Sequence, residues 1–294
     1  MKLILTGGTG FLGSNLLKLL LVNNFKIVVL KRSFSRLDRI DSVIQHPNLT
    51  LFDLDLENLD DLFAVSNIDF IIHTATEYGR SQSSIHALLE TNFIFPMWLI
   101  ELGIKYGVKG FINTDSYFNK KDSIYSYLQN YSLSKRNLVS WLHQLSNNIQ
   151  VSNIILEHIY GPSDNDVKFF PKMIQDIAIK ELPYIPLTEG NQKRDFIYVD
   201  DVASAYIFIL HYMMQEKFKY KVFEVGTGES ISVRNLVKKI KIISGSKSIL
   251  GFGDIDYRND EIMDSKAENS NLIDLGWRPV VSLENGVKKL IDSN

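Results

Sequence analysis

The first 160 residues alternate short apolar segments with longer stretches in which apolar residues recur at helical spacing. Apolar runs with little polar alternation are typical of strands that are buried on both faces of a parallel sheet. The pattern predicts strands at 3–6, 27–30, 49–54, 70–75, 110–114 and 151–156, and helices near 11–22, 35–45, 84–106 and 131–147. This alternation predicts an α/β fold, a Rossmann-like doubly wound parallel sheet with helices on both faces.

The pattern changes after Gly161-Pro162, where turn residues become frequent and the apolar segments shorten. We expect the sheet domain to occupy 1–160, with later segments such as 194–227 returning to it, and a smaller C-terminal lobe to occupy 161–294. A last amphipathic stretch at 283–291 predicts a helix that closes this lobe.

Composition narrows the possible functions. A formal net charge of −2 provides no basic field that would attract nucleic acid or an anionic membrane. The chain has no cysteine, which excludes disulfides and thiolate metal ligands, and its histidines lack zinc-site spacing, so we expect no metal. Because polar residues interrupt the N-terminal apolar run and no apolar stretch reaches about 18 residues, we expect a cytoplasmic protein without signal peptide or membrane span.

A glycine-rich turn, TGGTGFLG at 6–13, stands directly between the first predicted strand and the first predicted helix. Glycine in this context permits a tight turn, a close approach of backbone N–H groups to a pyrophosphate, and close packing of helix on strand. The turn therefore predicts a dinucleotide-binding loop. Its candidate contacts are Gly7, Gly10, Phe11, Leu12 and Gly13.

The end of the second predicted strand indicates which dinucleotide would bind. An acidic residue there would hold the ribose 2′-hydroxyl of NAD, but the strand ends in Lys31-Arg32-Ser33. Two cations and a hydroxyl suit a 2′-phosphate, so Arg32 and Ser33 favour NADP(H), the alternative being a solvated basic turn. At the end of the third strand, Asp53 could accept a hydrogen bond from the adenine amino group.

The catalytic candidates follow the fifth predicted strand, which ends near Thr114. Tyr131 and Lys135 are spaced i and i+4, so they share one face of a helix. An adjacent ammonium stabilises a phenolate, and we therefore expect Lys135 to lower the pKa of Tyr131 and make it a proton donor or acceptor. Thr114, at the carboxyl end of a parallel strand, lies where open α/β sheets bind ligands and could hydrogen-bond a substrate oxygen.

The order of these motifs resembles that of the extended short-chain dehydrogenase/reductase family, the NAD(P)-dependent nucleotide-sugar epimerases, dehydratases and reductases. The resemblance covers nearly the whole chain and rests on TGGTGFLG at 6–13, FDLD at 52–55, HTAT at 73–76, TDS at 114–116, YSLSK at 131–135, IYGP at 159–162, RDFIYVDD at 194–201 and GW at 276–277. It implies an oxidoreductase with a Thr114–Tyr131–Lys135 triad, in which Lys135 also holds the nicotinamide ribose.

The same resemblance implies further contacts. Arg194 and Arg258 would hold the diphosphate of the substrate, and arginine suits that group. Leu54 and Ala75 become candidates for cofactor contact, and Arg80, Asp115 and Ser116 for substrate contact. Family members often dimerise through two helix pairs, and the apolar residues of the 84–106 and 131–147 helices predict such a homodimer.

One departure from the family pattern bears on the reaction. The 4,6-dehydratases of the family end this strand in Thr-Asp-Glu, with the glutamate as base, whereas this chain has Thr114-Asp115-Ser116. Serine cannot remove a carbon-bound proton as that carboxylate does. Reduction of a ketone with NADPH is then favoured, while an NAD-dependent C4 epimerase and a non-catalytic NADP-binding regulator remain as alternatives.

Three segments, HTATEYGR at 73–80, FINTDSYFNKKD at 111–122 and LEHIYGP at 156–162, resemble more narrowly the CDP-3,6-dideoxyhexose synthases of bacterial O-antigen assembly, the group that makes CDP-abequose and CDP-paratose. This narrower resemblance implies a CDP-linked 4-ketosugar as substrate. One departure concerns the third segment: the family normally has an asparagine where His158 stands and an arginine where Ile155 stands.

Overall fold

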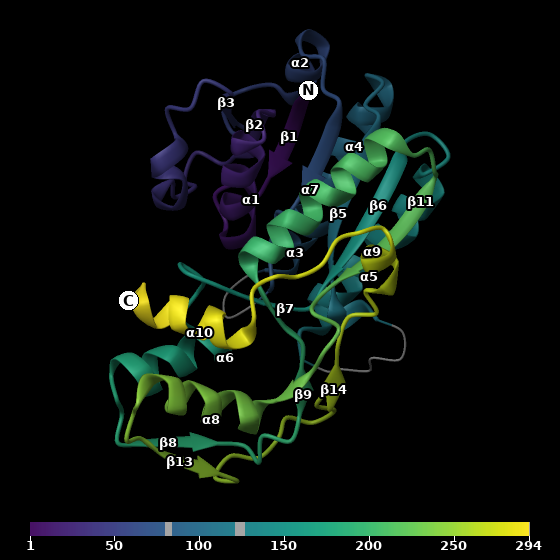
Figure 1. The fold of residues 1–294 in the computed structure, drawn as a ribbon. Helices are drawn as coiled ribbons and strands as arrows, with labels where there is room; N and C mark the ends of the chain where they lie inside the picture. Colours follow the sequence, from purple (N-terminus) through teal and green to yellow (C-terminus); the bar gives the residue numbers. More distant parts are fainter. Residues whose placement is uncertain (80–83, 121–126, 294) are drawn as a thin grey trace. The chain divides into compact units, whose positions relative to one another are not determined.

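The computed structural model describes residues 1–79, 84–120 and 127–293. The chain divides into two compact units, each drawn in Figure 1. The first comprises Met1–Lys121, Tyr127–Ile155 and Ala203–Phe223, and the second consists mainly of Leu156–Val202 and Glu224–Asn294. The sequence had suggested a division at residue 160 with a returning segment at 194–227.

A seven-stranded sheet organises the first unit and confirms the predicted doubly wound α/β fold. In spatial order its strands are β11 (Tyr220–Val225), β6 (Gln150–Leu156), β5 (Gly110–Ser116), β4 (Phe70–His73), β1 (Lys2–Thr6), β2 (Lys26–Lys31) and β3 (Leu49–Asp53). The pairs β1·β2, β1·β4, β2·β3 and β4·β5 are parallel. The strand order reverses direction between β1 and β4, and open α/β sheets bind ligands at such a point.

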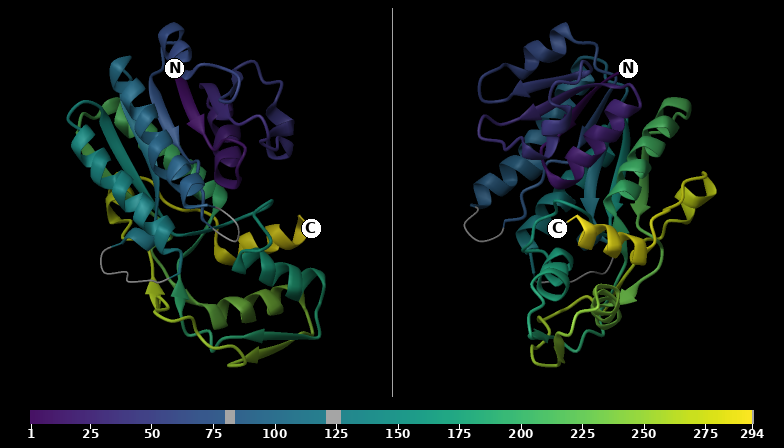
Figure 2. Two further views of the ribbon diagram at one scale, coloured as in Figure 1. Left: turned by 180° about the vertical axis from the view of Figure 1, so that it is seen from behind. Right: turned by 60° about the vertical axis from the view of Figure 1, so that its left-hand side comes forward.

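Helices cover both faces of this sheet, as Figures 1 and 2 show. One face packs on α2 (Leu59–Val65), α4 (Phe95–Lys105) and α5 (Gln129–Leu145), whose buried side chains share a core cluster with alternate strand residues. The other face carries α1 (Phe11–Val22) and α7 (Val199–Gln215). The strands are apolar on both faces because both faces are covered.

Two predicted helices differ in the structure. The 35–45 stretch forms only a short 3₁₀ turn, η1 (Asp38–Val43). The 84–106 stretch is interrupted: α3 (Ile85–Leu89) and α4 are joined by a π-helical turn, η2 (Glu90–Ile94). By length and composition, the helical run Ile85–Lys105 could cross a membrane, whereas we expected no stretch of this kind. Leu99 and Ile100 of this run are buried in the core cluster against the sheet.

The second unit has small sheets and short helices. Strand β7 (His158–Tyr160) pairs with β10 (Phe196–Tyr198), β9 (Lys193–Arg194) lies between β12 (Ile231–Ser232) and β14 (Asp264–Ser265), and β8 (Tyr184–Leu187) pairs with β13 (Ile249–Phe252). The helical segments are α6 (Phe169–Met173), the π turn η4 (Ile174–Ile179), α8 (Val233–Ser244), α9 (Ser270–Asp274) and the predicted closing helix α10 (Leu283–Asp292). The turn η4 contacts α8 and α10.

Candidate active site

The glycine-rich turn between β1 and α1 has the geometry of a phosphate-binding loop. Gly7 has a φ of +66°, and a Cβ there would lie 2.6 Å from the backbone nitrogen of Ala75. A Cβ on Gly13 would lie 2.1 Å from the Gly7 carbonyl oxygen, so this packing also requires glycine. Gly10 caps α1, and among the described residues no side chain caps its first turn. In the described part of the chain, the backbone N–H groups of this turn and of the first turn of α1 therefore have no side-chain cap and fit the pyrophosphate of a dinucleotide.

The residues predicted to select the cofactor lie together after β2, beside two carboxylates. The Arg32 Nε is 2.5 Å from an Asp55 oxygen, and the Ser33 backbone N–H donates to the same carboxylate at 2.8 Å. Asp53, the predicted adenine contact, accepts from the Lys31 Nζ at 2.5 Å and from the Ser33 hydroxyl at 2.9 Å. The hydrogen bond from Lys31 holds the pKa of Asp53 below its usual range. The sequence analysis had not identified Asp55 as part of this site.

Tyr131 and Lys135 lie one turn apart on α5, and both are buried. The Lys135 Nζ donates to the backbone carbonyl of Thr114 at 2.9 Å. Burial lowers the pKa of Lys135 to about 8, while the Asp115 carboxylate acts in the opposite direction. A lysine with this pKa is still largely charged at neutral pH and can stabilise negative charge nearby.

The pKa of Tyr131 differs from the expectation. Burial raises it well above the ordinary value, repulsion from Tyr78 adds to the rise, and a side-chain hydrogen bond with Ser116 opposes it. Desolvation outweighs any effect of Lys135 on this pKa. The phenolate loses more solvation free energy on burial than the neighbouring protein groups restore by their interactions with it. The phenol is consequently protonated at neutral pH, which is the state that a proton donor needs.

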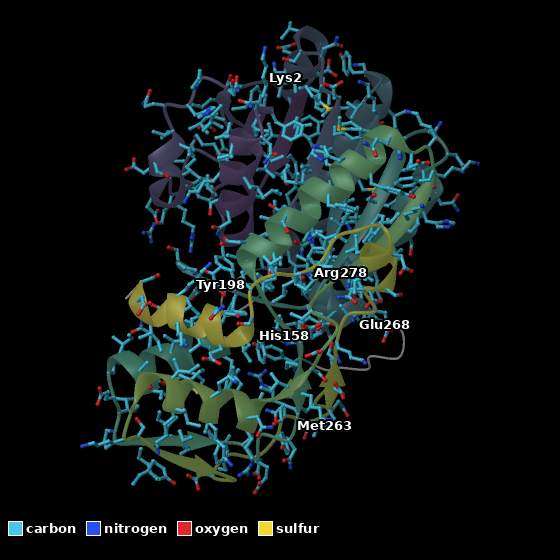
Figure 3. The ribbon with its side chains drawn as sticks, viewed as in Figure 1. Lys2, His158, Tyr198, Met263, Glu268 and Arg278 are labelled. Carbon is cyan, nitrogen blue, oxygen red and sulfur yellow. The ribbon has the colours of Figure 1, made fainter. Side chains whose placement is uncertain are left out.

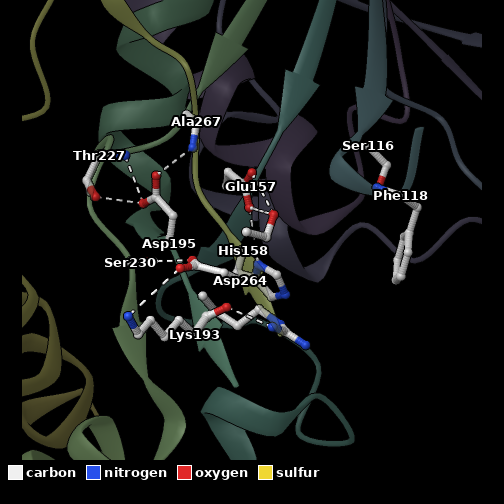
Figure 4. Close-up of polar contacts among 12 residues, drawn as sticks. Ser116, Phe118, Glu157, His158, Lys193, Asp195, Thr227, Ser230, Asp264 and Ala267 are labelled. Carbon is white, nitrogen blue, oxygen red and sulfur yellow. Dashed lines mark hydrogen bonds and ion pairs between the residues drawn. The ribbon is translucent and has the colours of Figure 1, made fainter. Parts of the chain in front are cut away.

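The three residues at the end of β5 point in different directions. The Thr114 hydroxyl shares a 2.7 Å hydrogen bond with Tyr206 of α7. The Asp115 carboxylate accepts three hydrogen bonds, from the Ser116 backbone at 2.8 Å, Asn119 at 2.7 Å and Asn153 at 3.1 Å, and burial raises its pKa. Ser116 accepts from the Phe118 backbone at 3.4 Å, a pair drawn in Figure 4.

The chain that carries this glycine turn and buried tyrosine–lysine pair is similar to known proteins over nearly its whole length. Residues 3–226 match the NAD dependent epimerase/dehydratase family. The chain belongs to this family. CDP-abequose synthase of Salmonella typhimurium is 36% identical over 98% of this chain and 96% of its own length, and the Salmonella muenchen enzyme of the same name is 37% identical over 99% and 97%. The resemblance inferred from the sequence is thereby confirmed.

Solved structures of the family share the fold. UDP-glucose 4-epimerase from Thermotoga maritima, in complex with UDP-glucose, superposes with a TM-score of 0.84 at 22% identity, covering 100% of this chain and 98% of its own. UDP-glucuronic acid 4-epimerase from Bacillus cereus, in complex with UDP-glucuronic acid and NAD, gives 0.83 at 22% identity with the same coverage. At this identity the likeness establishes the fold.

Two buried polar residues near the tyrosine–lysine pair were missed in the sequence analysis. Asn92, in the π turn η2, exchanges hydrogen bonds with the backbone of Glu77 at 2.8 and 2.7 Å and donates to the Ser134 hydroxyl of α5 at 3.1 Å. An asparagine within an apolar helical stretch was the available signal, because such a residue needs buried partners. Tyr206 gave no such signal, since its partner Thr114 is distant in the sequence.

The predicted substrate residues of the second unit differ in burial. Arg194 is buried and paired with Glu261, and it also donates to the Lys193 carbonyl at 2.7 Å. Arg258 is exposed, and the predicted contact Arg80 lies outside the described residues. The neighbouring Asp195 is fully buried and accepts from Thr227, Gly228 and Ala267, which fixes the chain beside Arg194 (Figure 4).

His158, one of the two departures from the family pattern, lies on β7 and is labelled in Figure 3. Its ring packs edge-on against Phe196 with centroids 5.5 Å apart, and its Nδ1 is 3.5 Å from the buried Glu157 carboxylate. That carboxylate in turn accepts from the Ser265 hydroxyl at about 3.0 Å. Burial lowers the pKa of His158, so its ring is neutral near pH 7.

An apolar hollow of about 460 Å³ lies on the outer side of α4 and α5. It is lined by Ile94, Met97, Trp98, Glu101, Ile104 and Leu145. This is the helix face for which the sequence predicted dimer contacts. Within the described ranges, no group of three or more His, Asp or Glu side chains is placed to hold a metal ion.

Proposed function

We propose that this chain is an NADPH-dependent reductase that converts the C4 ketone of CDP-4-keto-3,6-dideoxyglucose to an alcohol, giving CDP-abequose or CDP-paratose for O-antigen synthesis. The observation that carries the proposal is the buried Tyr131–Lys135 pair next to a strand that ends in Ser116 and not in a carboxylate base. The match over nearly the whole length to the CDP-abequose synthases of Salmonella supports the substrate.

The chemistry assigned to the residues is proton transfer to a forming alkoxide. When bound, the reduced nicotinamide supplies the hydride for the carbonyl carbon. Tyr131, whose raised pKa keeps it protonated, gives its proton to the carbonyl oxygen. The ammonium of Lys135 stabilises the negative charge that this proton transfer leaves on the phenolate of Tyr131. The glycine turn holds the cofactor pyrophosphate on backbone N–H groups.

We assign the cofactor preference to Arg32 and Ser33, which would bind a 2′-phosphate. When the cofactor binds, Arg32 would leave its ion pair with the Asp55 carboxylate and bind the 2′-phosphate. A guanidinium forms strong hydrogen bonds with a carboxylate and with a phosphate. For the substrate diphosphate we assign Arg194, which would exchange Glu261 in the same way, together with Arg258. The enzyme is proposed to act as a cytoplasmic homodimer.

The decisive experiment is a single turnover with NADPH carrying deuterium at the transferred position and a panel of nucleotide-4-ketosugars. Reduction places one stable deuterium at C4 of the sugar for each NADP⁺ formed. Tyr131→Phe keeps the ring and removes the proton, so turnover should fall by about 10²–10⁴-fold with NADPH affinity nearly unchanged. If a nucleotide hexose is converted while the label stays on the cofactor, the reductase assignment is wrong.

The NAD-dependent C4 epimerase is the competing assignment, because UDP-glucose 4-epimerase has the same fold. An epimerase returns the hydride to the carbon it came from and must therefore keep its cofactor bound. The absorbance of the purified protein separates the two assignments: a reductase is obtained largely free of nicotinamide, and an epimerase carries it.

A further inference from the structure

A second tyrosine stacks on Tyr131. The rings of Tyr78 and Tyr131 lie with their centroids 5.1 Å apart and their planes at 28°. Tyr78 keeps 38% of its surface exposed and Tyr131 only 4%, so Tyr78 is the outer ring of the pair. Phe118, in the 3₁₀ turn η3 (Tyr117–Asn119), meets Tyr131 edge-on with centroids 6.1 Å apart. A stacked contact and an edge contact together restrict how the Tyr131 ring can tilt.

The backbone just before Tyr78 is held by a buried amide. Asn92 of the π turn η2 has none of its surface exposed. Its Oδ1 accepts from the Glu77 backbone N–H at 2.8 Å, and its Nδ2 donates to the Glu77 carbonyl at 2.7 Å. Two opposed hydrogen bonds to one residue fix both the position and the direction of the chain there. π turns often occur at functional sites, and this one aims Asn92 at the residue that precedes Tyr78.

The backbone just after Tyr78 is held as well. The Gly79 backbone N–H donates to the Glu77 carboxylate at 2.9 Å. Gly79 has a φ of +66°, and a Cβ there would lie 2.6 Å from a methyl carbon of Leu88 in α3. Glycine is therefore required for the chain to turn this close to α3. Tyr78 stands between two fixed residues, and its ring is directed at Tyr131.

The same amide also reaches the helix that carries Tyr131. The Asn92 Nδ2 donates to the Ser134 hydroxyl at 3.1 Å, and that hydroxyl donates to the Tyr131 backbone carbonyl at 2.8 Å. Asn92 thus joins the segment of the outer ring to the helical turn of the inner ring. Loss of this side chain would leave several buried polar groups without a partner, so the network holds both segments firmly.

We propose that Tyr78 is a positioning residue for the reduction: its ring fixes the angle of the Tyr131 ring and keeps water from its face, and Asn92 holds Tyr78 in place. The inference rests on the proposed function, in which Tyr131 gives its proton to the ketone oxygen. Tyr78 transfers no proton, so its ring is needed and its hydroxyl is not. A reacting group displaced by about 1 Å can lose as much as about 10²-fold in rate.

The kinetic test compares two substitutions of Tyr78. Tyr78→Ala should reduce kcat by about tenfold to a hundredfold with little change in KM for NADPH, because the glycine turn is untouched. Tyr78→Phe keeps the ring and should retain most of the kcat. The matched control is Tyr106→Ala, which removes a tyrosine that stacks on Phe63 with centroids 6.0 Å apart, and it should leave kcat unchanged. The proposal is overturned if Tyr78→Ala keeps full kcat, or if Tyr78→Phe loses as much as Tyr78→Ala.

A second measurement does not depend on the substrate. The protein is labelled with 3-fluorotyrosine, and the ¹⁹F resonance of residue 131 is assigned by its loss in Tyr131→Phe. A stacked ring shifts this resonance through its ring current, so Tyr78→Ala should move the resonance and Tyr78→Phe should leave it nearly in place. Asn92→Ala should move it in the same direction as Tyr78→Ala, because Glu77 loses both of its bonds to the amide.

Each outcome of the labelling experiment decides one part of the inference. A resonance that does not respond to Tyr78→Ala overturns the role of Tyr78, and one that responds to Tyr78→Ala but not to Asn92→Ala overturns the role of Asn92. If Asn92→Ala does not fold, Asn92→Asp takes its place, since it keeps the acceptor for the Glu77 N–H and loses the donor. Absence of NADPH oxidation with every ketosugar would instead reject the proposed function, while the resonance still tests the placement of Tyr78.

Discussion

Lys135→Met should make the cofactor-free protein more stable while abolishing its activity. Lys135 is 1% exposed, and burial lowers its pKa from the ordinary 10.5 to about 8. A lowering of this size corresponds to roughly 3 kcal/mol of destabilisation for keeping the ammonium buried at neutral pH. Methionine fills a similar volume without the charge. It also removes the hydrogen bond to the Thr114 carbonyl, worth about 1–2 kcal/mol, so the net gain at pH 7 is about 1–2 kcal/mol.

The predicted stability difference between Lys135→Met and the unsubstituted protein depends on pH. The folded pKa of Lys135, about 8, lies below the unfolded value of 10.5, so between these values the unfolded chain binds more protons than the folded one. The stability of the unsubstituted protein therefore rises with pH across that window. Lys135→Met lacks this contribution, and its advantage should disappear by about pH 10.5.

The assay is urea unfolding of the cofactor-free proteins, followed by far-ultraviolet circular dichroism at pH 7 and at pH 10. Lys109→Met is the matched control, because the Lys109 Nζ forms an exposed ion pair with Asp69 at 2.6 Å and its loss should change stability by less than about 1 kcal/mol. The reasoning fails if Lys135→Met is less stable than the unsubstituted protein at pH 7, or if the difference between them is the same at both pH values.

Two further predictions concern the cofactor and the assembly. Arg32→Ala should raise KM for NADPH much more than KM for NADH. Asp55→Asn releases Arg32 from its ion pair and should lower KM for NADPH. If Arg32→Ala changes KM for both cofactors equally, the assignment of Arg32 to the 2′-phosphate is wrong. Light scattering should give a dimeric mass at micromolar concentration, and Trp98→Glu combined with Trp141→Glu should give the monomer, because both side chains are about half exposed on the outer helix face; a monomeric mass for the unsubstituted chain would contradict the predicted interface.

The order of elements in the first unit was readable from the sequence because each element leaves a local pattern. The apolar run at 27–30 corresponds to β2 (Lys26–Lys31), and the periodic stretch at 11–22 to α1. The π turn at Glu90–Ile94 could not be predicted from the sequence, because Asn92 in this turn hydrogen-bonds to the backbone of Glu77 and to the hydroxyl of Ser134. Only the folded chain brings those groups together.

The sequence by itself determined the family, the glycine turn and the tyrosine–lysine pair, since each depends on residues close together along the chain. The tertiary structure decided how the side chains at the end of β5 are used. Thr114 bonds to Tyr206 of α7, 92 positions further along the chain. Strand alternation and the packing of α7 on this face of β5 set that direction, and residue types in a motif do not encode which face meets which helix.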